Sequence, residues 1–171
     1  EIIEQVTAAK AVEIIEKVTI TKAVEIVEKV TTAKAVEIVE NIATAKAVEI
    51  VEKVTTTKAV EIVEKITTAK AVKIVEDVEE QKAAGIVELV TTIKASAILG
   101  GVTPVKAGSL INRIATDKVT AIVQVMSAEK LVERLPEATA QKLFELPPQL
   151  LFSRLPGVPT EHLVKETTPL P

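Results

Sequence analysis

The carboxylates of this chain recur at a regular spacing, and they are the first place to look for chemistry. Five glutamates follow one another at intervals of twelve residues: Glu13, Glu25, Glu37, Glu49 and Glu61. Mg²⁺ and Ca²⁺ bind carboxylates only when several oxygens lie within about 2.0–2.6 Å of one ion. Helices packed side by side keep their axes about 8–10 Å apart. Glutamates on successive packed helices could not share an ion, so the pattern predicts no metal site.

Catalysis has few other residues to use. The chain contains one histidine, His162, and two aspartates, Asp77 and Asp117, with no cysteine and no tyrosine. A general base must lie within hydrogen-bond reach of the proton that it removes, whereas His162 stands in a proline-rich stretch where we expect a solvated side chain. No glycine-rich phosphate loop is present. We therefore predict that the protein is not an enzyme and takes no cofactor.

Charge and hydropathy narrow the range of partners. The formal net charge is −3 and the two signs are interspersed, which gives no basic surface for nucleic acid. The uncharged run over residues 95–105 is too short to cross a membrane as a helix. We predict no nucleic-acid partner and no transmembrane segment. The chain starts at Glu1 in the middle of a repeat, which favours a processed product or a piece of a longer protein.

A lysine recurs every twelve residues from Lys10 to Lys142 and marks a tandem repeat. Within a unit, apolar residues follow the spacing of a helix face. Twelve residues advance a helix by about 120° beyond whole turns, so one continuous helix would wind its apolar face around the rod. The helix must therefore end and restart in each unit. A hydroxyl residue in one phase supplies the expected N-caps: Thr7, Thr19, Thr31, Thr55, Thr67, Thr91, Thr103, Ser127 and Thr139.

The units are too short to be stable alone, because helices of about nine residues do not persist in water. Each must pack on other units. We predict an all-α fold, a solenoid or superhelix of about twelve short amphipathic helices with one helix per 12-residue repeat and a Pro-rich C-terminal cap. The repeats span residues 1–144, near-identical over 1–72 and diverged over 73–144, and residues 145–171 form the cap and a linker. We expect the lysine row to be solvated, so that Lys→Ala changes are nearly silent.

Three stretches carry a resemblance to a known family. They are TTAKAVEIVE from Thr31, SAEKLVERL from Ser127 and LPPQLLFSRL from Leu146, and each contains a cap residue or a proline together with an apolar pair. These units resemble the cytosolic N-terminal domain of MgtE-type magnesium transporters over nearly the whole chain. The resemblance implies a right-handed superhelix of short helices. Since the chain has no matching acidic motif, no magnesium-sensing residue is carried over.

The outward positions lose their charges after Lys73, and larger apolar residues appear among them. We expect residues 85–125 to present an apolar strip, covered by the proline-rich tail, a second copy or a different protein. Alternatively, the strip results only from sequence divergence of older repeats and binds no partner. The predicted interface residues are Leu89, Ile93, Ala97, Gly100, Gly101, Val105, Ala121 and Val125.

Two functional hypotheses follow. The first is a non-catalytic structural repeat protein, a rigid scaffold, spacer or filament-forming element that acts by self-association. The alternative is a protein-binding solenoid module or a regulatory domain of a larger, transporter-like protein. The predicted partner is thus the chain itself or another protein. The compartment stays open because the chain lacks cysteine, with the cell surface or the extracellular space favoured.

Overall fold

The computed structural model describes residues 2–154, and the regular elements in that range are all helical. His162 and residues 155–171 of the predicted cap and linker lie outside the described residues. Within the described range every helix falls short of the length and hydropathy that a membrane crossing requires.

The repeat produces a run of helices of ten residues each. A short helix, α1 (Ile2–Gln5), precedes the run, and η1, a 3₁₀ turn (Leu135–Glu137), follows α12. The full-length helices are α2 (Ala8–Lys17), α3 (Ile20–Lys29), α4 (Thr32–Asn41), α5 (Thr44–Lys53), α6 (Thr56–Lys65), α7 (Thr68–Asp77), α8 (Glu80–Leu89), α9 (Thr92–Gly101), α10 (Pro104–Arg113) and α11 (Thr116–Val125). The shorter helices at the C-terminal end are α12 (Ala128–Arg134), α13 (Ala140–Phe144) and α14 (Pro148–Arg154).

The predicted N-caps are confirmed. At each of them the side-chain oxygen accepts from the backbone N–H of the lysine three residues later, as between Thr55 and Lys58 at 3.2 Å. Ala43, Glu79 and Ala115 stand in the same phase without such a bond. At the other end of each helix an extended residue turns the chain away, for example Val54 with φ −67° and ψ 164°. These two features end and restart the helix in every unit.

The core is a continuous column of alanine, isoleucine, valine and leucine. In α6 it consists of Ala59, Ile62 and Val63, each with no exposed surface, and the C-cap Ile66 lies beside them. The same phases are buried from one full-length helix to the next. A small alanine at one of these positions lets neighbouring helices approach closely.

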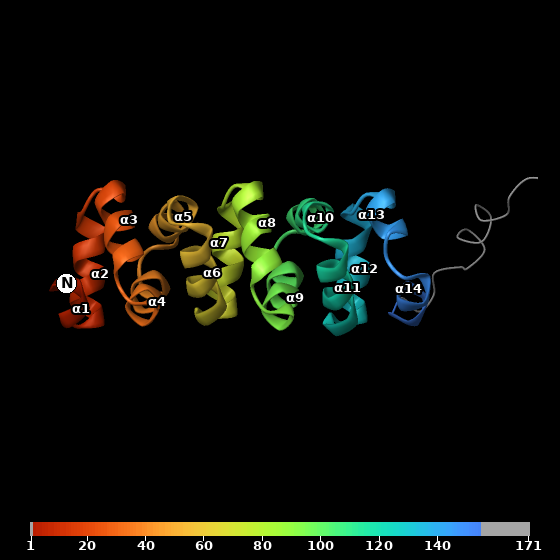
Figure 1. Cartoon of the computed structure of the whole chain (residues 1–171), viewed down its shortest axis with the longest axis horizontal. Helices are drawn as coiled ribbons and strands as arrows, with labels where there is room; N and C mark the ends of the chain where they lie inside the picture. The colour runs from red at the N-terminus through yellow and green to blue at the C-terminus, as the bar shows by residue number, and fades with distance from the viewer. Residues whose placement is uncertain (1, 155–171) are drawn as a thin grey trace, which may run out of the picture.

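Helices two apart in the chain pack side by side, as α4 does with α6 and α7 with α9. The N-terminal end of each helix also meets the C-terminal end of the helix three before it, as at α6 and α9. The neighbours in the next turn are thus two and three helices away, so one superhelical turn contains between two and three helices. The array runs along its long axis from α1 to α14, and α5 and α10 repeat one orientation (Figure 1).

The predicted all-α solenoid with one helix per repeat is confirmed. One assumption about it is wrong: successive helices are not the main packing partners, so glutamates such as Glu49 and Glu61 do not line up on adjacent helices. Among the described residues no group of three or more potential metal ligands comes together. The boundary at residue 144 stays a prediction.

Candidate functional site

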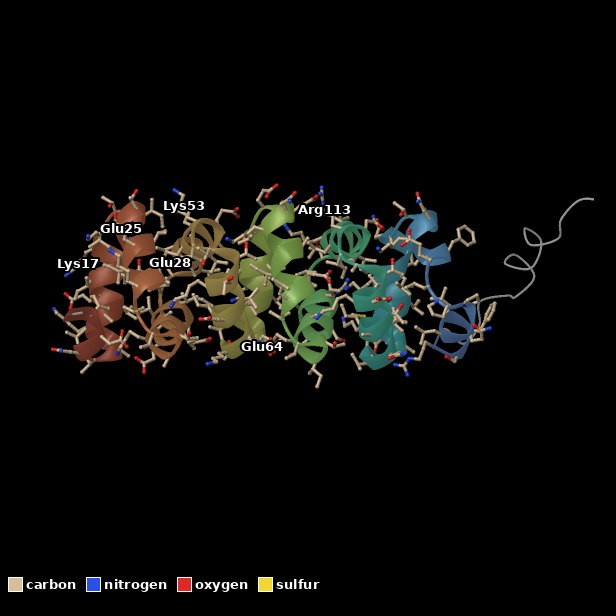
Figure 2. All side chains as sticks on the ribbon, viewed as in Figure 1. Lys17, Glu25, Glu28, Lys53, Glu64 and Arg113 are labelled. Carbon is tan, nitrogen blue, oxygen red and sulfur yellow. The ribbon has the colours of Figure 1, made fainter. Side chains whose placement is uncertain are left out.

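The most regular polar feature is the contact between the C-terminal end of one helix and the N-terminal end of the helix three later, here called the joint. At the α6–α9 joint, the Glu64 carboxylate accepts from the Thr91 backbone N–H and from the Thr91 hydroxyl, both at 2.8 Å. The Lys94 amine donates to the carbonyl oxygen of Ile66, the C-cap of α6, at 2.5 Å. Figure 2 shows Glu64, together with Glu28 of an earlier joint.

The same two bonds recur at successive joints. A glutamate near the end of the earlier helix accepts from the N-cap N–H of the later helix at 2.7–3.2 Å. The glutamates are Glu4, Glu16, Glu28, Glu40, Glu52, Glu64, Glu76 and Glu88. A lysine of the later helix donates to the carbonyl that closes the earlier one. The lysines are Lys34, Lys46, Lys58, Lys70, Lys82, Lys94, Lys106 and Lys118.

Each joint satisfies groups that a short helix leaves unpaired. The first N–H groups and the last carbonyls of an α-helix have no partner inside it. A carboxylate at the N-terminus and an ammonium at the C-terminus also oppose the partial charges of the helix dipole. Hydrogen bonds to charged groups are stronger than neutral ones. The joint therefore links each helix to the next turn of the superhelix at both ends.

The lysines of the joints are partly buried, contrary to the expectation of a solvated row. Lys10 and Lys22, which belong to no described joint, have side chains 56% and 60% exposed, whereas that of Lys34 is 12% exposed. Burial lowers the pKa of Lys70, Lys82 and Lys94 below the ordinary value of lysine, and nearby carboxylates partly oppose this shift. The premise of a solvated lysine row is thus wrong for these residues, and the predicted silence of Lys→Ala changes loses its basis there.

Sequence reasoning missed the joint although a signal was present. The lysine phase runs without a break to Lys142, whereas the outward glutamate phase is interrupted after Glu61 and returns only at Glu133. A lysine needed only for solubility would have no reason to remain in the units that lack the outward glutamate. The partner, however, lies 28 residues earlier and belongs to a helix three units away. The fold is needed to know that offset.

The predicted interface residues lie on four helices. Leu89 (63% exposed) ends α8, Ile93 (76%) and Val105 (71%) stand in the first turns of α9 and α10, and Val125 (51%) ends α11. Ala97, Gly100 and Ala121 are half-buried, and Gly101 is exposed. A Cβ atom on Gly101 would lie 2.5 Å from Cγ2 of Val72, so this glycine is needed for packing between α7 and α9. That these residues form one interface stays a prediction.

A groove lies between α8 and α10. Its volume is about 320 Å³, and Gln81, Ala84, Gly85, Glu88, Arg113 and Ile114 line it. Ala84 and Gly85 stand where earlier units have valine and glutamate or lysine, as in Val72 and Lys73. The loss of these two side chains opens the groove. Arg113 at its edge is held by Glu80 through a contact of 2.8 Å.

Outside the joints, Glu13 accepts from Lys17 at 2.6 Å and from Lys10 at 2.9 Å. These hydrogen bonds, that from Lys17 first, and the charges of the two amines lower the pKa of Glu13 to about 2. Since the folded pKa lies below the ordinary 4.5, the stabilisation is present above that value and is lost as the pH falls towards 2.

We expect a carboxyl titration followed by NMR to give Glu13 a midpoint near 2, and Lys17→Ala to move the midpoint upward because it removes the strongest donor. Lys65→Ala, on a distant helix, is the control and should leave the Glu13 midpoint unchanged. A Glu13 midpoint that does not respond to Lys17→Ala would contradict the assigned cause.

Comparison with known proteins gives one match. The family model described as the MgtE intracellular N domain matches residues 6–98. The chain matched no curated protein and no solved structure. The matched segment begins directly after α1 and continues into α9, so it covers most of the regular helices and five complete joints, from α2–α5 to α6–α9. The resemblance inferred from the short repeats is confirmed, and the chain belongs to the family of the MgtE intracellular N domain.

Proposed function

We propose that this chain is a non-catalytic regulatory domain of a magnesium-transporter-like protein, and that it acts as a stiff helical arm inside the cell. The observation that carries the proposal is the family match over residues 6–98. It favours the alternative of the two functional hypotheses over the self-assembling scaffold. The intracellular location follows the description of the family and replaces the cell-surface location favoured at first.

The joints give the proposed arm its physical character. Each helix in the regular part is attached to the turn before it by a carboxylate and an amine at the same positions. Repeat arrays transmit stability from unit to unit through nearest-neighbour interfaces. An arm built in this way holds the two ends of the jointed segment, α1 and α11, at a fixed distance and orientation, which suits a domain that passes a change of position to a channel or pore.

The proposal can be tested in the protein's own host by deleting the part of the gene that encodes residues 6–98. We expect magnesium uptake to lose part of its dependence on the intracellular magnesium concentration. The matched control is a deletion of one whole 12-residue unit within the near-identical part, which should shorten the arm but leave it folded. Uptake unaffected by either deletion would contradict the regulatory role. If light scattering then showed that the particle mass increases with the concentration of the chain, the self-assembling scaffold would be favoured.

The groove between α8 and α10 favours a second candidate function, a protein-binding module. Its floor is small and apolar at Ala84 and Gly85, and the charged side chains of Glu88 and Arg113 stand at its edge. Such a groove can accept a side chain projecting from a partner. Gly85→Trp would fill the groove, and loss of a partner with this variant, measured by titration calorimetry, would support the binding module.

A further inference from the structure

The joint between α9 and α12 lacks both of the bonds that define the earlier joints. Gly100 occupies the position of the glutamate and has no side chain to offer. The Lys130 amine donates to Glu133 of its own helix at 2.9 Å. Among the hydrogen bonds of residues 2–154, none joins the backbone N–H of Ser127 or the amine of Lys130 to α9. The regular pair of bonds therefore first fails at this joint.

Arg134 provides the remaining polar contact of this joint, but two of its own nitrogen atoms are left without a hydrogen bond. Its Nη2 donates to the carbonyl oxygen of Gly100 at 3.1 Å. The residue is only 5% exposed, and its Nε and Nη1 atoms have no hydrogen-bond partner. Nη1 forms an ion pair with Oε1 of Glu133 at 3.3 Å, without the geometry of a hydrogen bond, while Lys130 binds Oε2 of the same carboxylate. Buried polar atoms without partners destabilise a fold.

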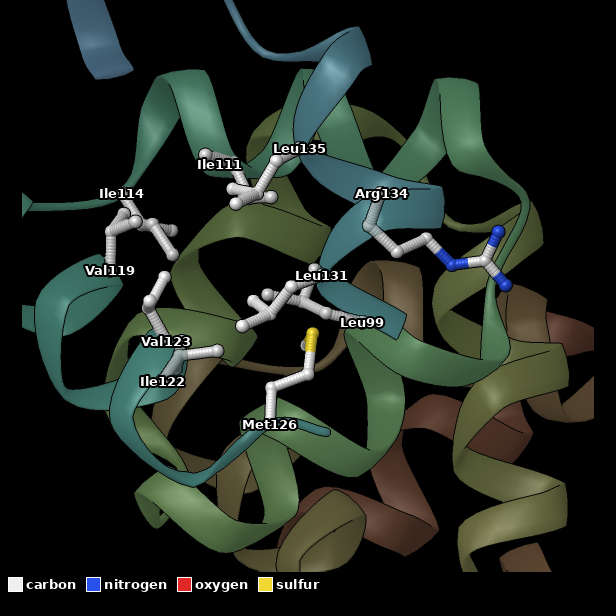
Figure 3. A pocket seen from close by; sticks show the side chains of 10 residues that line it. All are labelled: Leu99, Ile111, Ile114, Val119, Ile122, Val123, Met126, Leu131, Arg134 and Leu135. Atoms are coloured by element: carbon white, nitrogen blue, oxygen red, sulfur yellow. The ribbon is translucent and has the colours of Figure 1, made fainter. Parts of the chain in front are cut away.

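Packing around Arg134 is also incomplete. A cavity of about 10 Å³, lined mainly by apolar residues including Leu99, Met126 and Leu131, lies next to its side chain (Figure 3). Interiors of proteins normally leave few such voids. The helix itself is shortened, because α12 has seven residues and gives way to η1. Since α12 is shorter than the full-length helices and borders a small void, it has fewer residues with which to pack against the array.

The segment that follows is tied to the array by bonds of a different kind, one of which is the hydrogen bond that the Thr116 hydroxyl donates to the Glu145 carboxylate at 2.5 Å. The N–H of Thr139 donates to the side-chain oxygen of Asn112 at 2.8 Å, and Arg154 donates to the carbonyl of Met126 at 2.5 Å. Lys142 donates to the Thr116 hydroxyl in place of a C-cap carbonyl. The earlier joints each have a carboxylate and an amine in place.

We propose that the α9–α12 joint is a release point of the array, at which residues 128–154 detach as a unit while the segment from α4 to α11 stays assembled. Detachment removes the unpaired atoms of Arg134 from a buried environment. It also uncovers the apolar ends of α10 and α11, including Ile111, Ile114 and Met126. The segment thereby acts as a displaceable end of the array, and this property does not depend on the family role proposed above.

Hydrogen exchange of the full chain, followed by mass spectrometry, tests the release point. Regions that open more readily exchange faster than the rest of a structure. We expect the amides of residues 131–146 to exchange about tenfold or more faster than those of the equivalent positions in α5 to α9. Gly100→Glu should slow exchange in residues 128–154 by about tenfold, because it restores an acceptor for the Ser127 N–H. The added Cβ has room, since its nearest neighbour outside its own helix is Cγ of Lys130 at 3.7 Å.

Gly85→Glu is the matched control, since it adds the same side chain to a helix at an outward position that belongs to no joint. It should leave exchange in residues 128–154 unchanged. Glu88→Gly creates the same vacancy at the α8–α11 joint and should speed exchange in α11, which keeps the test open should Gly100→Glu fail to fold. Uniform protection from residue 32 to residue 154 would overturn the proposal. Equal effects of Gly100→Glu and Gly85→Glu would also overturn it.

Discussion

Lys94→Ala should lower the free energy of unfolding by about 1.5–3 kcal/mol, the range for hydrogen bonds to charged groups. The change removes the donor to the Ile66 carbonyl and leaves that acceptor partly buried at the α6–α9 joint. Lys65→Ala is the control, because Lys65 is exposed and its side chain makes no hydrogen bond or ion pair within residues 2–154. Its effect should stay within about 0.5 kcal/mol. Urea denaturation followed by circular dichroism measures both.

Removal of the carboxylate at the same joint should lower the free energy of unfolding by a similar amount. Glu64→Ala removes the acceptor of the Thr91 N–H and hydroxyl, and we expect a loss of about 1.5–3 kcal/mol. Glu49→Ala is its control, because Glu49 is exposed and its carboxylate makes no hydrogen bond or ion pair in the described part of the chain. Because both groups act at one interface, the double variant Glu64→Ala with Lys94→Ala should depart from additivity. Joint variants that are as mild as their controls would show that the bonds contribute little and that apolar packing alone holds the array.

Gly108→Ala should destabilise the C-terminal part of the array by about 1–3 kcal/mol, the usual cost of overpacking. A Cβ atom at Gly108 would lie 2.5 Å from the backbone oxygen of Glu137 and 2.6 Å from its carbonyl carbon. Backbone cannot rotate away as a side chain can, so α10 and η1 must separate. Thermal unfolding measured by calorimetry would show the loss.

Gly85→Ala is the matched control, because both glycines lie inside ten-residue helices. The nearest atom to a Cβ at Gly85 is Cγ2 of Thr56 at 3.4 Å, an ordinary contact. Alanine is favoured over glycine in a helix by about 1 kcal/mol, so Gly85→Ala should stabilise the protein. If Gly108→Ala also stabilised it, the close approach of α10 and η1 would be contradicted.

The local structure of this protein could be predicted because its causes are local. The apolar spacing within each unit places Ala59, Ile62 and Val63 on one helix face, and all three are buried. Thr55 and its equivalents cap the helices because a hydroxyl three residues before an amide reaches it without help from the fold. The exposure of Leu89 and Ile93 also follows from their phase in the repeat. The family resemblance rests on these same features.

The role of the charged residues was decided by the tertiary structure alone. The sequence by itself determined that short capped helices repeat every twelve residues and must pack on each other. It did not determine which helices become neighbours, because that depends on the angle of each turn between units, which the C-cap backbone sets. With neighbours two and three units away, Lys94 meets Ile66 and Glu64 meets Thr91. Gly100, which we interpreted as part of a surface strip, leaves the α9–α12 joint without its carboxylate for the same reason.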